Sequence, residues 1–172
     1  MSELSIWFER KFEFVFPVEL YPNLRVRLRG APARLEELVN GLSPGVLTRK
    51  PDGKWSIQEN AGHLLDLEPL WASRVEDFLA GAELLTAADL ANKKTDQADH
   101  NGCSFKEIVS AFRTAREKSV SCLEDLPPET FARSALHPRL KTPMRFVDHL
   151  YFVAEHDDHH LARIWELSQK RG

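Results

Sequence analysis

Residues 146–164 read FVDHLYFVAEHDDHHLARI, and this stretch decides the fold. Its apolar side chains recur at helical spacing and form one stripe, made of Phe146, Leu150, Val153, Leu161 and Ile164. Thr142 and Pro143 precede the stretch as an N-cap residue and a proline at the first helical position. We therefore expect a helix from there to about residue 168, with one face packed against other helices.

Two further helices are expected upstream of residue 81. The first spans about residues 31–42, and the second about 57–80. Ser56 and Glu59 form a capping-box pattern where the second helix begins. Pro69 lies inside the second helix, and we expect it to kink that helix rather than end it, because the apolar period resumes beyond it.

A third upstream helix is expected over about residues 104–126, where Pro127 and Pro128 end it. We find no strong strand pattern and no internal repeat. The sequence therefore predicts an all-α fold, a four-helix bundle over residues 30–172. An irregular leader over residues 1–29 is expected to pack on that bundle.

The composition narrows the range of functions. The chain has 172 residues, 42% of them hydrophobic and 28% charged, with a formal net charge of -3, so no basic surface for nucleic acid is indicated. No apolar run approaches the ~18 residues of a membrane span. The N-terminus lacks the pattern of a signal peptide, so we expect a cytoplasmic protein in which Cys103 and Cys122 are free thiols.

Two histidines four residues apart, His156 and His160, carry the strongest functional signal. This spacing places both imidazoles on one face of a helix, where a single metal ion can reach them. His63 stands near the start of the second expected helix and can supply a third nitrogen. The alternative is a solvated helix face with structural histidines, because this spacing also arises by chance.

Three other polar residues are candidates for supporting roles. Asp157 falls within the apolar stripe, so it either orients the second ring nitrogen of a metal ligand or a neighbouring helix, or it caps a backbone or tryptophan N–H. Glu68 also lies at a core position, where it either pairs with an arginine or backs up a metal site. His149 is a candidate proton carrier at the edge of a pocket.

Four polar residues are expected to face away from any site. Asp66 and His159 project from the outer sides of their helices, and His100 and His137 fall in expected loops. We interpret all four as surface residues. Motifs for a zinc protease, a nucleophilic serine, a phosphate loop or a dinucleotide fold are absent from the sequence.

Two motifs together resemble those of the DinB-like superfamily, the YfiT-related group of metal-dependent bundle proteins. The first motif is Trp55-Ser56-Ile57-Gln58-Glu59-x-x-x-His63-Leu64-x-Asp66-x-Glu68. The second is His156-Asp157-x-His159-His160-Leu161-x-x-Ile164. The resemblance covers roughly residues 30–170. It implies an up-down-down-up four-helix bundle, frequent dimers, and a divalent metal held by His63, His156 and His160.

Some characterised members of that group are thiol transferases that use bacillithiol, mycothiol or glutathione, and others are isomerases. An ion on three neutral imidazoles also keeps an open position, which is typical of a catalytic site. We therefore expect metal-assisted transfer with a low-molecular-weight thiol, or hydrolysis of a small molecule, in a homodimer. Zinc or nickel suits the site best, and iron or manganese fits with added waters. The alternative is a stress-linked, non-catalytic module that binds a metal or a small molecule.

Overall fold

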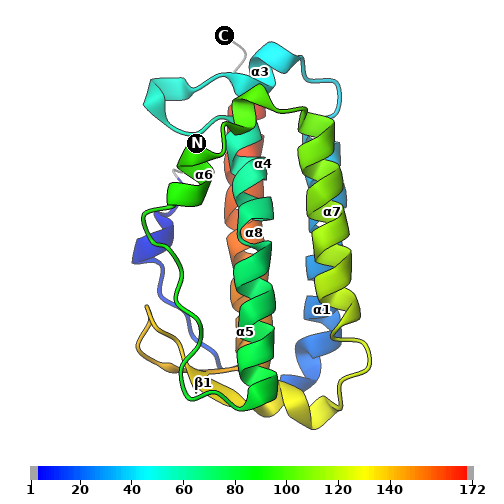
Figure 1. Cartoon of the computed structure of the whole chain (residues 1–172), viewed down its shortest axis with the longest axis vertical. Helices are drawn as coiled ribbons and strands as arrows, with labels where there is room; N and C mark the ends of the chain where they lie inside the picture. The colour runs from blue at the N-terminus through cyan, green and yellow to red at the C-terminus, as the bar shows by residue number, and fades with distance from the viewer. Residues whose placement is uncertain (1–3, 170–172) are drawn as a thin grey trace.

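The computed structural model describes residues 4–169, and four helical rods form its body (Figure 1). The rods consist of α1 (Tyr21–Arg29) with α2 (Ala31–Val39), α4 (Ile57–Asp66) with α5 (Glu68–Ala80), α7 (Phe105–Ser121), and α8 (Phe146–Gln169). In Figure 1, α8 runs behind α4 and α5 along the bundle. The predicted helical bundle is therefore confirmed as the main architecture. No helix within residues 4–169 has the length and hydrophobicity of a membrane span.

Short elements precede the first rod or connect the rods. They are α3 (Pro44–Thr48), α6 (Lys93–Gln97) and the 3-10 helices Trp7–Glu9, Val18–Leu20, Pro51–Gly53, His100–Gly102 and Pro128–Ala132. Helix α6 packs against α4, and so does the 3-10 helix at His100–Gly102. The long connection between α5 and α7 is thus attached to the second rod rather than projecting from it.

The prediction of a fold without strands is wrong at one end of the bundle. Strands β1 (Ser134–Leu136) and β2 (Pro143–Arg145) pair antiparallel, with Ala135 opposite Met144. Pro143 thus belongs to a strand, and α8 begins only at Phe146. The Asp148 carboxylate accepts the backbone N–H of Arg145 at 2.8 Å, which satisfies a donor at the start of this helix.

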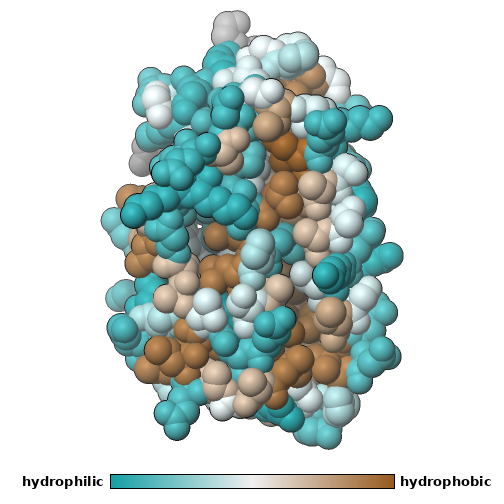
Figure 2. Space-filling view, viewed as in Figure 1, coloured by the Kyte–Doolittle hydropathy of each residue, from teal (hydrophilic) through white to brown (hydrophobic). Residues whose placement is uncertain are grey.

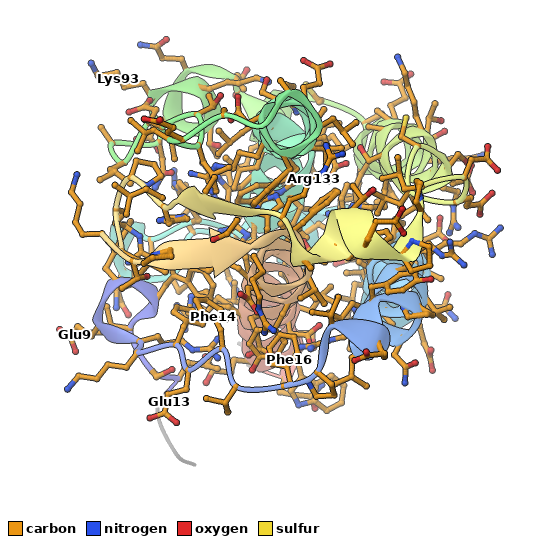
Figure 3. The ribbon with its side chains drawn as sticks, turned by 90° about the horizontal axis from the view of Figure 1, so that it is seen from below. Glu9, Glu13, Phe14, Phe16, Lys93 and Arg133 are labelled. Atoms are coloured by element: carbon orange, nitrogen blue, oxygen red, sulfur yellow. The ribbon has the colours of Figure 1, made fainter. Side chains whose placement is uncertain are left out.

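The leader is shorter than predicted, because residues 21–29 form α1. Pro22 lies in the first turn of this helix, where backbone N–H groups have no acceptor within the helix. A proline there removes no hydrogen bond, so it is compatible with the start of the helix. The preceding segment crosses the end of the bundle beside the two strands (Figure 3). Arg145 holds it there, since its guanidinium donates to the carbonyls of Phe14 and Phe16 at 3.3 and 3.0 Å.

The second rod is interrupted at a single residue, Leu67, between α4 and α5. The backbone N–H of Leu67 donates to the backbone carbonyl of His63 at 3.2 Å, and the N–H of Trp71 donates to the backbone carbonyl of Leu67 at 3.0 Å. Pro69 lies in the first turn of α5, where its missing N–H costs nothing. The interruption is therefore local and the rod continues beyond the proline, as predicted.

A layer of buried charge separates two apolar clusters inside the bundle. On α7, Arg116 lies between Phe112 of one cluster and Val120 of the other. Glu68 follows Leu64 in the same way on the second rod, and Asp157 lies between Val153 and Leu161 on α8. The Arg116 guanidinium binds both carboxylates and also donates to the Leu28 carbonyl at 3.1 Å. One side chain thereby connects all four rods.

Candidate metal centre

The three histidines predicted to bind metal meet at one point between two rods. His63 lies on α4, while His156 and His160 lie one turn apart on α8. One ligand atom from each ring lies within 4.8 Å of the other two. Ring centroids are 5.3 Å apart for His63 and His156, and 4.7 Å for His63 and His160. The three side chains are therefore within reach of a single ion.

A hydrogen-bonded chain fixes the ring of His63. Its Nδ1 lies 3.0 Å from the Thr95 hydroxyl, which in turn donates to the Asp66 carboxylate at 2.9 Å. The single hydroxyl proton is used on Asp66, so the Thr95 oxygen accepts from Nδ1–H of His63. This tautomer leaves the lone pair of His63 on Nε2, free for a metal ion.

An amide oxygen fixes the ring of His160 in the same sense. Asn60 donates its Nδ2 to the Ser56 carbonyl at 2.7 Å, which determines the orientation of the amide. Its Oδ1 lies 2.9 Å from Nδ1 of His160 and can only accept. His160 therefore carries its proton on Nδ1 and presents Nε2 as a ligand atom.

The third ring, His156, is buried without a polar partner for its Nδ1 among the described residues. Its neighbours are indole rings, with Trp7 at 5.0 Å and Trp71 at 5.7 Å between ring centroids. A buried ring nitrogen without a partner is unfavourable. One nitrogen of this ring converges with those of His63 and His160 beside the cavity, and three neutral imidazoles are a donor set that fits a divalent ion.

All three imidazoles are held in the neutral form that ligates metal. Burial lowers the pKa of His63 to about 4, against a smaller opposing effect of the Asp66 charge. Burial also lowers the pKa of His156 and of His160 well below 6.5, and repulsion from neighbouring histidines acts in the same direction. No proton therefore competes with a cation at neutral pH.

The cluster faces a cavity of about 690 Å³. Figure 2 shows a hollow on this face of the molecule, beside the rod of α4 and α5 and below α6. Its lining is mainly apolar and aromatic, and includes Trp7, Trp55 and Trp71. No sequence pattern predicts Trp7 at this site, because that residue comes from the leader.

Glu68 and Asp157 do not support the metal ligands, as one prediction for each had it. Both carboxylates bind Arg116, whose Nη2 lies 2.6 Å from Glu68 and 3.1 Å from Asp157. Neither has a hydrogen bond to His63, His156 or His160 among the described residues. The arginine partner, one of the two alternatives for Glu68, is correct, and so is the contact of Asp157 with a neighbouring helix, because Arg116 lies on α7. The residues that orient the rings are Thr95 and Asn60.

His149 does not lie at the edge of the pocket, as predicted for a proton carrier. It is fully buried between Trp71 and Phe78, whose ring centroids lie 5.8 and 5.7 Å from its own. It is absent from the cavity lining, and burial lowers its pKa well below 6.5. His149 therefore belongs to the core.

The four residues interpreted as surface side chains are all at least partly buried. His100 donates to Asp66 at 2.8 Å, and its ring packs on Gly62, where a Cβ atom would approach it to 2.3 Å. His137 and His159 line the cavity. Gly62 lies inside a predicted helix and could have indicated this contact, because a glycine allows another segment to approach closely.

Comparisons with known proteins agree with this geometry. The family model of the DinB superfamily matches residues 27–164. A curated relative from Bacillus subtilis (strain 168), named "Putative metal-dependent hydrolase YfiT", is 24% identical over 152 residues, which cover 84% of this chain and 82% of the relative.

A solved structure gives the same fold. Its title reads "YfiT from Bacillus subtilis is a probable metal-dependent hydrolase with an unusual four-helix bundle topology". It superposes with a TM-score of 0.81 at 21% identity, over 94% of this chain and 93% of that one. Because the family model spans most of the sequence and includes all three clustered histidines, the chain belongs to the DinB superfamily.

Proposed function

We propose that this protein is a metal-dependent hydrolase of small molecules, with His63, His156 and His160 as the metal ligands. The observation that carries the proposal is a cluster of three neutral histidines, pre-oriented by Thr95 and Asn60, in the wall of a large cavity. The name of the Bacillus subtilis relative supports hydrolysis. When bound, a divalent ion would supply Lewis acidity and an activated water.

The protein contributes orientation, exclusion of water and a proton acceptor. Trp7 and Trp71 cover one side of His156 with apolar surface, which strengthens electrostatic interactions at the cluster. His159 lies beside His160, with ring centroids 5.3 Å apart, and lines the same cavity. Burial lowers its pKa, so this imidazole is neutral at pH 7 and can accept a proton there.

The size of the cavity favours transfer to a thiol as a second candidate. About 690 Å³ lies within the range of pockets for drug-sized ligands and exceeds what a minimal hydrolytic substrate needs. A low-molecular-weight thiol and its acceptor therefore have room to bind together. A thiol-dependent product would favour this reaction over hydrolysis.

Four narrower features accompany the proposal. Zinc or nickel is the ion that such a nitrogen site favours, with iron or manganese next. We also propose the up-down-down-up helix order. It is supported by Figure 1, where α4 and α7 both start near the end of the molecule at which α8 ends. The homodimer and the cytoplasmic location stay predictions.

Elemental analysis of the untagged protein tests the ligand assignment. The wild type should hold one divalent ion per chain, and His156→Ala should lose it. The matched control is His159→Ala, which removes a cavity histidine outside the cluster and should retain the metal. Wild-type metal content in His156→Ala would refute the assignment.

A substrate panel tests the reaction. Esters, amides and phosphoesters, with and without a thiol, are incubated with the loaded protein and with the chelated protein. Chelator-sensitive cleavage without thiol supports hydrolysis. A protein that keeps its ion but turns over none of these substrates would contradict the enzymatic proposal and favour a binding module.

A further inference from the structure

Besides the histidine cluster, the cavity contains cationic groups with few acidic partners in its lining. The charged residues in its lining are Lys54, Arg74, Asp89, Arg139 and Arg163. The carboxylate of Asp89 accepts two backbone N–H groups, from Ala91 and Lys93 at 3.0 and 2.9 Å. This acid is therefore occupied by its own loop, and the cavity carries an excess of positive charge.

Arg139 has a donor without an acceptor. Its Nη2 atom is buried and makes no hydrogen bond within residues 4–169. Two aromatic rings hold the guanidinium, with its carbon 5.4 Å from the Phe8 centroid and 5.7 Å from that of Phe152. A buried guanidinium N–H without an acceptor is unfavourable, so this position calls for a ligand that accepts hydrogen bonds.

His137, whose ring contacts the backbone of Arg139, adds a second donor to the cavity. Its Nδ1 accepts the backbone N–H groups of Arg139 and Leu140 at 3.2 and 3.1 Å. A neutral imidazole has one lone pair in the ring plane, so the proton of His137 must be on Nε2. Burial, with repulsion from Arg74 and Arg139, lowers the pKa of His137 to about 3, which keeps the ring neutral.

Arg74 provides the third donor. Its Nη1 lies 3.2 Å from Nε2 of His137, although both atoms carry protons that they can only donate. Its Nε is already used on the Thr86 carbonyl at 2.9 Å, and Asp77, the nearby acid, accepts the backbone N–H of Thr86. Two donors that face each other need a common acceptor between or beside them.

We propose that Arg74, His137 and Arg139 form a binding subsite for an oxyanion, a carboxylate or phosphate group of the substrate. A single oxyanion has enough lone pairs to accept from all three side chains, and it would neutralise part of the cationic excess. The subsite lies close to the histidine cluster. Trp71 contacts both, with the guanidinium carbon of Arg74 5.5 Å from its ring centroid and the ring of His156 at 5.7 Å.

The subsite would anchor the charged end of a substrate while its reactive end reaches the three histidines. That orienting role rests on the proposed metal-dependent function, whereas oxyanion binding itself does not. Arg139 is a binding residue in this proposal, and its substitution should weaken substrate binding rather than remove the ion.

Anion titration of the metal-free protein tests the subsite, because chelation removes direct binding of the anion to an ion. The probes are inorganic phosphate and acetate, with acetamide as the uncharged match of acetate. Fluorescence of the cavity tryptophans and titration calorimetry report binding. The wild type should bind at least one of the two anions and not acetamide, and the stronger anion identifies phosphate or carboxylate as the natural group.

Arg139→Met should weaken that binding by roughly ten-fold or more, as expected for hydrogen bonds to a charged group. Arg139→Lys keeps the charge but not the forked donors, and should lie between the two. The matched control is Arg163→Met, which removes a cavity arginine already paired with Glu166 at 3.0 Å and should change the affinity less than two-fold. Circular dichroism checks that each variant is folded.

Equal anion affinity in the wild type and Arg139→Met, or no anion binding by the wild type, would overturn the subsite. Loss of binding in Arg163→Met with retention in Arg139→Met would also overturn it. Metal content is measured on separate loaded samples of the same variants. A failed anion test with one ion per chain refutes this inference alone, whereas anion binding without any metal uptake refutes the proposed function alone.

Discussion

Two groups of buried polar side chains lie within a few turns of each other in this bundle, and they differ in how completely they are paired. Around Arg116, the carboxylates of Glu68 and Asp157 and the carbonyl of Leu28 take up the donors of the guanidinium. In the histidine cluster, the outer nitrogens of two rings are hydrogen-bonded, while the inner ligand atoms converge without a hydrogen bond to any residue in the described part of the chain.

The difference separates a structural site from a functional one. A buried ion network with every group satisfied holds the rods together and has no capacity left for a ligand. A group of neutral nitrogens that converge beside a cavity has that capacity. Burial alone does not distinguish the two, because His160 and Glu68 are both largely inaccessible to solvent.

Removing the cation from the paired network should have the largest effect on stability. Arg116→Met leaves Glu68 and Asp157 buried without a counter-charge, which should cost about 3–5 kcal/mol of unfolding free energy. Urea unfolding measures this loss. A cost below ~1 kcal/mol would mean that the network is not the structural connection inferred here.

Removing the Thr95 hydroxyl beside the histidine cluster should weaken metal binding, whereas removing the Ser119 hydroxyl beside the Arg116 network should not. Thr95→Val keeps the shape of the side chain but breaks the link between His63 and Asp66, so the metal dissociation constant should rise roughly ten- to hundred-fold. Ser119→Ala removes a hydroxyl that donates to Glu68 at 3.2 Å and should leave the constant unchanged. Competition with a chromogenic chelator measures both. Equal constants for Thr95→Val and wild type would contradict the role of Thr95.

His149 belongs to neither group, and its burial makes the stability of the fold depend on pH. Burial, with repulsion from Arg74, lowers its pKa well below 6.5 in the folded state, while the same side chain in the unfolded chain has a pKa of ~6.5. Below that value the unfolded state binds more protons, so stability is present above pH ~6.5 and is lost as the pH falls. At pH ~5.5 one such histidine costs about 1.4 kcal/mol.

His149→Leu should therefore lose less stability than the wild type between pH ~7.5 and ~5.5, by about 1.4 kcal/mol. Urea unfolding of the metal-free proteins at the two pH values measures the difference, since the metal ligands then contribute equally to both chains. Identical losses would show that His149 is protonated in the folded state at pH ~5.5.

The helices and the three clustered histidines could be predicted from the sequence because their signals are local. Helical periodicity, capping residues and a spacing of four residues are properties of one segment at a time. The hairpin was not predicted, because the strands Ser134–Leu136 and Pro143–Arg145 are too short to show an alternation of apolar and polar residues. Thr142-Pro143 also fits the start of a helix.

The partners of those residues could not be predicted in the same way. Thr95 reaches His63 from a connection whose path depends on the whole fold, and Trp7 reaches His156 from the leader. Periodicity placed Glu68 and Asp157 correctly in the core but did not name their partner. Arg116 could have been identified as that partner, since it is a charged residue at an inner position of its helix, between Phe112 and Val120.

The smallest effect is expected from an arginine one turn away from Arg116. Arg113 also lies on α7 and also binds a carboxylate, Glu36 at 2.7 Å, but both side chains are largely exposed, at 36% and 51%. Solvent screens such a pair, so Arg113→Met should change the unfolding free energy by less than ~1 kcal/mol. Urea unfolding beside Arg116→Met compares the same substitution at two positions of one helix. A loss in Arg113→Met as large as that in Arg116→Met would mean that removing any arginine from α7 destabilises the bundle, and burial would no longer explain the difference.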